Sequence, residues 1–160
     1  REGAAPENVF PDIGPVGYHA WFDADHVALW RLQDPSLLQV VALDDPRPRT
    51  IATRVGRSPQ AVPGRRAVSF TRPTGDGMVI ELYDLDLDRT QTLALLPEGG
   101  EFHTWTPDGV LLGSAGSSVF AWREGSWRRV VDLAHRQVKV SRLAVSADGT
   151  RLALVAEPAR

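Results

Sequence analysis

The sequence has no cysteine among its 160 residues. This excludes disulfide bonds, thiolate metal sites and a cysteine nucleophile within the chain. The sequence also lacks any run of the roughly 18 apolar residues that a membrane helix needs, and residues 1–20 lack the apolar core of a signal peptide. No charge of one sign prevails, because 18 basic residues stand against 20 acidic ones, for a net charge of −2. We therefore expect neither a membrane span nor a nucleic-acid partner.

The motifs of common catalytic and cofactor-binding sites are missing as well. There is no G-x-S-x-G motif, since Ala115 occupies the nucleophile position in the segment GSAGS at 113–117. The sequence contains no H-E-x-x-H zinc motif, phosphate-binding loop or dinucleotide fingerprint. We predict a protein that is not an enzyme and that uses no cofactor or metal ion.

The residues that are present indicate an all-β fold. Apolar residues alternate with polar ones or form short runs, and Pro, Gly and Asp interrupt them at intervals of about 8–12 residues. This spacing is typical of β-sandwiches, barrels and propellers. Tight turns are predicted at Pro63-Gly64, at Pro107-Asp108-Gly109 and at Ala147-Asp148-Gly149, where Gly accepts a positive φ.

An internal repeat distinguishes a propeller from the other all-β folds. Four segments each consist of a strand, a Pro/Asp/Gly turn and a second apolar strand: HAWFDADHVALW, QAVPGRRAVSF, HTWTPDGVLLGS and LAVSADGTRLAL. Trp21 and Trp105 lie 84 residues apart, or two steps of 42, and Asp108 and Asp148 lie 40 apart. A period of this length with about four strands matches one blade of a β-propeller.

The repeat predicts about 3.5 blades of four antiparallel strands in one partial propeller domain, residues 1–160. The predicted parts are blade one at 17–54, blade two at 57–97, blade three at 100–134, a half blade at 140–156 and a leading outer strand near 8–11. The leading strand has no neighbour to pair with in a closed four-bladed ring. We therefore expect the chain to be part of a longer propeller, with the closed four-bladed ring as the alternative.

The segments FHTWTPDGVLLGSAGSSVFAW and RLAVSADGTRLALVAE resemble the repeat of TolB-type, WD-like propellers, whose inner hairpin commonly reads W-S-P-D-G. Trp105, Pro107, Asp108 and Gly109 match this hairpin, and the fourth repeat matches it with Ala in place of Pro, keeping the residues Asp148 and Gly149. The resemblance covers residues 17–157 and implies a six-bladed ring and a periplasmic or secreted location. It assigns Trp21, Trp105 and the turn residues to structural roles in turns and in packing between blades.

Two histidines on the predicted inner strands are candidate ligands. His19 and His103 each precede a Trp by two residues, so each shares a strand face with Trp21 or Trp105. They could line the central channel and bind a metal ion or a small anion. The structural alternative is that each histidine forms a hydrogen bond between blades while its Trp packs against the next blade. This alternative is favoured, because the other repeats carry Pro59 and Leu143 near this position.

Arginines form the other candidate surface. Arg54, Arg57, Arg65 and Arg66 flank the inner strand of blade two, where they could attract an acidic partner segment or simply be solvated turn residues. The candidate face for a partner or ligand comprises His19, His103, Arg57, Arg65, Arg66 and Arg142.

The acidic string Asp84, Asp86 and Asp88 does not match a calcium loop, because Arg89 and Leu95 occupy the positions that require Gly and an acid. We expect instead a solvated strand face followed by a hairpin turn.

These features predict a non-enzymatic propeller scaffold that binds a protein or peptide partner, and the resemblance implies that it does so in the bacterial cell envelope. Its loops and channel mouth would present the binding surface. One alternative is the propeller part of a larger hydrolase, such as a serine peptidase, in which it would control substrate access. Another is a propeller that binds a small ligand or metal ion in its channel. The sequence determines neither the identity of the partner nor the oligomeric state.

Overall fold

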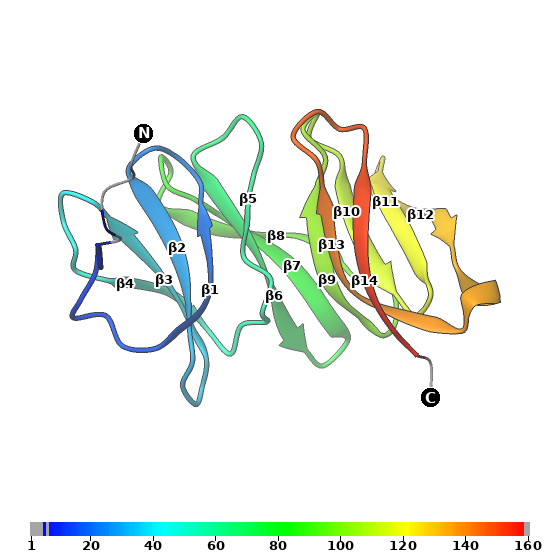
Figure 1. The fold of residues 1–160 in the computed structure, drawn as a ribbon, viewed down its shortest axis with the longest axis horizontal. Helices are drawn as coiled ribbons and strands as arrows, with labels where there is room; N and C mark the ends of the chain where they lie inside the picture. Colours follow the sequence, from blue (N-terminus) through cyan, green and yellow to red (C-terminus); the bar gives the residue numbers. More distant parts are fainter. Residues whose placement is uncertain (1–4, 6, 159–160) are drawn as a thin grey trace.

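The computed structural model describes residue 5 and residues 7–158, and within them almost all regular structure is antiparallel β-sheet. Three four-stranded sheets and one two-stranded sheet follow one another in chain order (Figure 1). Each sheet is a simple meander, in which every strand pairs with the next along the chain. The prediction of an all-β chain is confirmed.

The strands have the following bounds. The first sheet contains β1 (Val16–Trp21), β2 (His26–Arg31), β3 (Leu37–Ala42) and β4 (Arg49–Thr53). The second sheet contains β5 (Gln60–Ala61), β6 (Ala67–Thr74), β7 (Gly77–Asp84) and β8 (Arg89–Leu95). The third sheet contains β9 (Gly100–Trp105), β10 (Leu111–Ala115), β11 (Ser118–Arg123) and β12 (Ser126–Asp132). The two-stranded sheet contains β13 (Val138–Val145) and β14 (Leu152–Pro158), and a short 3-10 helix (Ala134–Arg136) precedes it.

The prediction of a leading outer strand near residues 8–11 is wrong. Residues 7–15 contain no strand. Instead, Asn8 Oδ1 accepts a hydrogen bond from the backbone N–H of Phe10, and the N–H of Ile13 donates to the carbonyl of Phe10. Phe10 and Ile13 then pack on an apolar cluster of the first sheet, formed by Val27, Leu29 and Val41. Apolar contact with this face replaces the strand pairing that the pattern suggested.

Apolar side chains fill the space between neighbouring sheets. Ala28, Trp30 and Leu38 of the first sheet pack against Val68 and Phe70 of the second. This follows from the pleat, since alternate side chains of a strand point to opposite faces, and both faces of an inner sheet are covered. The third sheet packs on the two-stranded sheet in the same way through Leu112, Val119, Ala121, Val140 and Leu143.

The turn motifs form as tight reversals. The N–H of Gly109 donates to the Thr106 carbonyl, and Gly109 has a φ of 84°, which favours glycine. Gly149, with a φ of 71°, closes the equivalent turn on the Ser146 carbonyl. Hydrogen bonds from Ser146 and Thr150 hold the pKa of Asp148 at about 2. A Cβ atom at Gly149 would lie 3.7 Å from Pro107 Cδ, so the two turns are neighbours.

Candidate functional site

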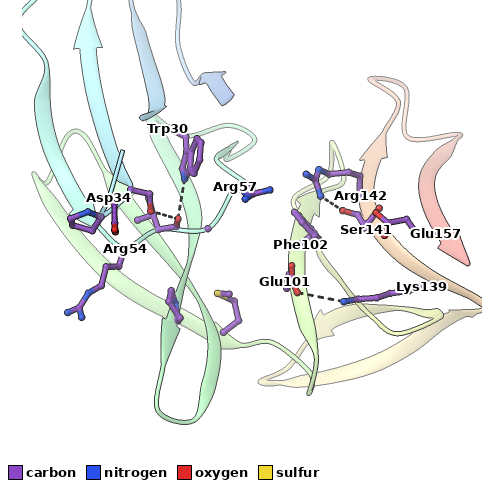
Figure 2. A pocket seen from close by; sticks show the side chains of 16 residues that line it. Trp30, Asp34, Arg54, Arg57, Glu101, Phe102, Lys139, Ser141, Arg142 and Glu157 are labelled. Atoms are coloured by element: carbon purple, nitrogen blue, oxygen red, sulfur yellow. Dashed lines mark hydrogen bonds and ion pairs between the residues drawn. The ribbon is translucent and has the colours of Figure 1, made fainter. Parts of the chain in front are cut away.

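The inner strands of the four sheets, β1, β5, β9 and β13, surround the candidate site. A cavity of about 770 Å³ adjoins it, lined by the loops that follow β2 and β4, by the facing ends of β6 and β7 and by residues of β9, β13 and β14. Figure 2 shows side chains from all four sheets around this cavity. A smaller pocket of about 130 Å³ shares Arg57, Phe102 and Arg142 with this cavity. We call the smaller one the arginine pocket. Its lining also includes Tyr18, His19, Ser58, Pro59, Gln60, His103 and Leu143.

The loop that carries Arg57 is held firmly from both neighbouring sheets. Trp30 Nε1 and Ser36 Oγ both donate to the carbonyl of Val55, at 3.1 and 2.8 Å. The N–H of Gly56 donates to the carbonyl of Thr71. A Cβ atom at Gly56 would lie 2.1 Å from Thr71 Oγ1, so only glycine allows this close approach. Arg57 is therefore presented from a fixed backbone.

Arg142 reaches the site from the side opposite Arg57, as Figure 2 shows for the larger cavity that both residues also line. An irregularity in strand pairing between Val140 and Arg142 marks a β-bulge, a feature that redirects side chains. The Arg142 guanidinium lies 4.0 Å from the centre of the Phe102 ring and donates to Tyr18 Oη at 3.0 Å. This bond links β13 to β1 across the site, between residues 124 positions apart.

The arginine pocket carries positive charge without a matching carboxylate. Its lining contains two arginines and no Asp or Glu. Neither Arg57 nor Arg142 has an ion pair with any residue in the described part of the chain. The larger cavity does contain acids, but one of them, Glu101, lies 3.7 Å from Lys139. The arginine pocket can therefore accept an anionic group without displacing an existing ion pair.

His103 is buried beside the pocket and takes part in a contact between sheets. Its Nε2 lies 2.7 Å from Ser69 Oγ of the second sheet, and Trp105 Nε1 donates to the same oxygen at 2.8 Å. Burial lowers the pKa of His103 to about 3, so the ring is neutral. This geometry is the hydrogen bond between blades that the structural alternative predicts for His103. His19 lies on the exposed β1 strand and lines the arginine pocket, but it does not share this contact.

Arg65 and Arg66 lie outside the site. Arg65 pairs with Asp84, and Arg66 pairs with Asp23 and Asp86. Burial on its own raises the pKa of Asp23, but hydrogen bonds from the Asp25 backbone, Arg66 and His26 outweigh it and bring the pKa to about 2. These ion pairs connect the β1–β2 turn of the first sheet to the turns of the second.

The acidic string does form a hairpin turn, between β7 and β8. Its first residue, Asp84, is buried, contrary to the expected solvated face. Each carboxylate pairs with one arginine: Asp84 with Arg65, Asp86 with Arg66 and Asp88 with Arg49. The Arg65 guanidinium lowers the pKa of Asp84, and Arg49 lowers that of Asp88. The string thus joins the first two sheets.

The two repeated tryptophans differ in their surroundings. Trp105 packs against Val62, Ala67 and Leu82 of the second sheet, as predicted for packing between blades. Trp21 is 43% exposed, because its side of β1 faces away from the second sheet. The expected packing role of Trp21 is therefore not realised within the described residues.

The sequence motifs did not identify three side chains at the site. Tyr18, Phe102 and Ser69 hold or contact the arginine and histidine groups, but none of them is a His, a Trp or a turn residue of the repeat. The alternation along β9 was the one usable signal. It places Phe102 on the face opposite His103, next to the following sheet.

Comparison with known proteins establishes the fold. No family model and no curated protein sequence matches the chain. Among solved structures, TolB from Acinetobacter baumannii matches 90% of this chain with a TM-score of 0.70 and 21% identity. The β-propeller domain of the Trilobed protease from Pyrococcus furiosus matches 91% of it with a TM-score of 0.53 and 12% identity. The chain folds as a β-propeller.

The predicted propeller fold and its likeness to TolB are thereby confirmed. A gluconolactonase from Xanthomonas campestris, XC5397, is also similar, with a TM-score of 0.65, 11% identity and 83% of this chain covered. The propeller chain spans 38% of the TolB chain, 51% of the gluconolactonase chain and 64% of the protease propeller. At these identities the comparisons establish the fold alone, and the six-bladed ring stays a prediction.

Proposed function

We propose that this propeller is a protein-interaction module that binds a peptide segment of its partner in the arginine pocket and the larger cavity beside it. The observation that carries the proposal is the arginine pocket, where Arg57 and Arg142 face a common space that holds no carboxylate. An acidic side chain or a C-terminal carboxylate of the partner would fill it. The proposal makes the chain a scaffold without catalysis, as expected from the sequence.

The chemistry of the pocket suits a carboxylate anchor. A guanidinium presents its donors in a planar fork that matches a carboxylate, and such charge-assisted hydrogen bonds are stronger than neutral ones. The Phe102 ring against Arg142 limits access of water to one side of that guanidinium. The larger cavity, of about 770 Å³, would accommodate the residues that flank the anchor.

An array of random 12-residue peptides tests the proposal. We expect the peptides retained by the chain to share an Asp, a Glu or a free C-terminal carboxylate, and to lose binding when it is replaced by an amide. Arg57→Gln should weaken binding of these peptides about tenfold or more, since a hydrogen bond to a charged group contributes about 1.5–3 kcal/mol.

Arg89→Gln is the matched control, because it removes the same charge from an exposed position on β8, away from the pocket. It should leave peptide affinity unchanged at physiological salt. The proposal fails if the retained peptides carry no common acid, or if Arg57→Gln and Arg89→Gln have equal effects.

Three expectations from the sequence stay predictions. A role as the propeller part of a larger hydrolase is tested by looking for a nucleophile elbow in the full reading frame that encodes this chain. A channel metal site receives less support, because His103 Nε2 already contacts Ser69. The periplasmic or secreted location is tested by cell fractionation. In the part of the chain that the structure describes, no helix has the length and hydrophobicity to cross a bilayer.

A further inference from the structure

The larger cavity has charges of opposite sign in its two parts. In the part that it shares with the arginine pocket, Arg57 and Arg142 supply two positive charges. Farther along β13 and β14, its wall is formed by Glu101, Lys139 and Glu157, which Figure 2 also shows. We call these three residues the acidic end. It holds two carboxylates against one ammonium group, so its sum is a single negative charge.

The excess negative charge of the acidic end is not neutralised by its neighbours. Lys139 Nζ lies 3.7 Å from Glu101 Oε1, and both of these side chains are about half exposed. Glu157 lies opposite Lys139 in the ladder of β13 and β14, yet it forms no ion pair with any residue that the structure describes. The loops across the cavity carry Asp34 and Arg54, one charge of each sign. Glu157 can therefore accept a cationic group from a ligand.

The pairing of β13 with β14 sets the distance between the two parts. Arg142 pairs with Val155 and Lys139 pairs with Glu157, so the two levels are two residues apart on β14. A strand rises about 3.3 Å per residue, which places Glu157 about 7 Å along the sheet from the level of Arg142. In an extended peptide, residues two positions apart point to the same side and are separated by the same distance. The charges of the cavity therefore match alternate residues of an extended peptide.

We propose that the preferred partner segment is extended and carries a Lys or Arg two positions from its acidic anchor, and that Glu157 selects this basic residue. The inference rests on the proposed function, because the anchor in the arginine pocket determines where the basic side chain lies in the cavity. A second cavity, of about 580 Å³, shares Lys139 and Glu157 with the larger one and is also lined by Gly116 and Gln137. It provides space for the chain beyond the basic residue.

The expected gain in affinity is small but selective. Glu157 is exposed to water, and an ion pair between exposed side chains contributes little. Lys139 also repels the incoming base. We therefore expect the basic residue to tighten binding about two- to fivefold. Glu157 would discriminate among segments that already hold an anchor, and the arginines would supply most of the affinity.

Four peptides of equal length test the proposal. Each has one Glu and one Arg in a background of Ser and Gly, with blocked termini, so that the Glu is the only carboxylate. In the two near peptides the Arg lies two positions before or after the Glu, and in the two far peptides it lies six positions before or after. All four have the same net charge, so only the spacing differs. Fluorescence anisotropy measures their Kd for the 160-residue chain.

We expect one near peptide to bind about two- to fivefold more tightly than its far counterpart. Glu157→Gln should abolish this preference, and Lys139→Gln should increase it, because it removes the repulsive charge. Asp44→Asn is the matched control, since it removes one negative charge from the exposed loop between β3 and β4 and lines neither cavity nor the arginine pocket. It should leave the preference unchanged.

Two results overturn the proposal and leave the peptide site intact. One is equal binding of near and far peptides in both orders while Arg57→Gln still weakens all four. The other is a preference for the near peptide that persists in Glu157→Gln. A different result, binding that does not depend on the Glu of the peptides, refutes the proposed function and this inference with it.

Discussion

The hydroxyl of Ser69 offers the sharpest test of how neighbouring sheets are held together. It is fully buried on β6 and lies at the point where His103 and Trp105 of the third sheet meet. Ser69→Ala removes this hydroxyl and leaves the strand, the apolar packing and the net charge unchanged. The substitution therefore isolates the polar contact between the two sheets.

The cost follows from burial of the two partners. His103 is 1% exposed, so its Nε2 would find no water in place of the serine. A buried polar group left without a partner costs about 1–3 kcal/mol. Trp105, which is only half-buried, also loses the acceptor of its indole N–H. We expect a loss of about 2 kcal/mol in the free energy of unfolding.

Ser114→Ala is the matched control. Ser114 is also a buried serine in the second strand of its sheet, but its Oγ has no hydrogen-bond partner among the residues described. Removing an unsatisfied hydroxyl releases a desolvation cost, so this variant should equal or exceed the parent in stability. Urea unfolding followed by tryptophan fluorescence compares the three proteins. In a thermal melt, Ser69→Ala should lower the midpoint by about 4–8 °C.

Equal effects of the two substitutions would refute the reasoning. A difference smaller than about 0.5 kcal/mol, the usual range for neutral surface changes, would mean that the Ser69 hydroxyl does not hold the sheets together.

Three further outcomes are expected. Burial lowers the pKa of His103 to about 3 in the folded chain, so its ring takes up a proton near pH 6.5 only when the chain is unfolded. The free energy of unfolding, measured by urea titration, should therefore fall by about 2 kcal/mol between pH 7 and 5. His103→Gln should reduce this dependence of stability on pH. Gly100→Ala places a Cβ atom 2.8 Å from two backbone carbonyl oxygens and should lower the free energy of unfolding by about 1–3 kcal/mol. At Gly75 an added Cβ atom meets nothing within 4 Å, so Gly75→Ala should be close to neutral in the same melts. Asp23→Asn should lower the melting midpoint more than Asp86→Asn does. Asp23 accepts hydrogen bonds from His26, Asp25 and Arg66, whereas Asp86 forms one exposed ion pair. Equal shifts of the midpoint would count against a linking role for Asp23.

Much of the fold was readable in the local pattern. Alternation and turn residues predicted an all-β chain with tight glycine turns, because both act over a few neighbouring residues. The exception was the segment near 8–11, where the apolar residues Val9 and Phe10 suggested a strand. No pairing partner lies beside it in the described structure, and Phe10 packs on the first sheet instead.

The candidate site was predicted only in part. His19, His103, Arg57 and Arg142 do line one pocket, whereas Arg65 and Arg66 are taken by carboxylates of neighbouring turns. Nothing local distinguishes these arginines, since all are exposed or half-exposed basic residues. Which of them face the pocket depends on how one sheet is rotated against the next.

The order of the amino acids alone specified a repeat of about 42 residues, its strands, its glycine turns and an all-β propeller, because these depend on alternation and backbone preference within each blade. Only the packing of sheet on sheet decided which repeated residue became buried. Trp105 and Trp21 occupy the same position in their repeats, yet one meets Ser69 and the other is exposed. The difference comes from the neighbouring sheet, whose contribution a single repeat does not encode.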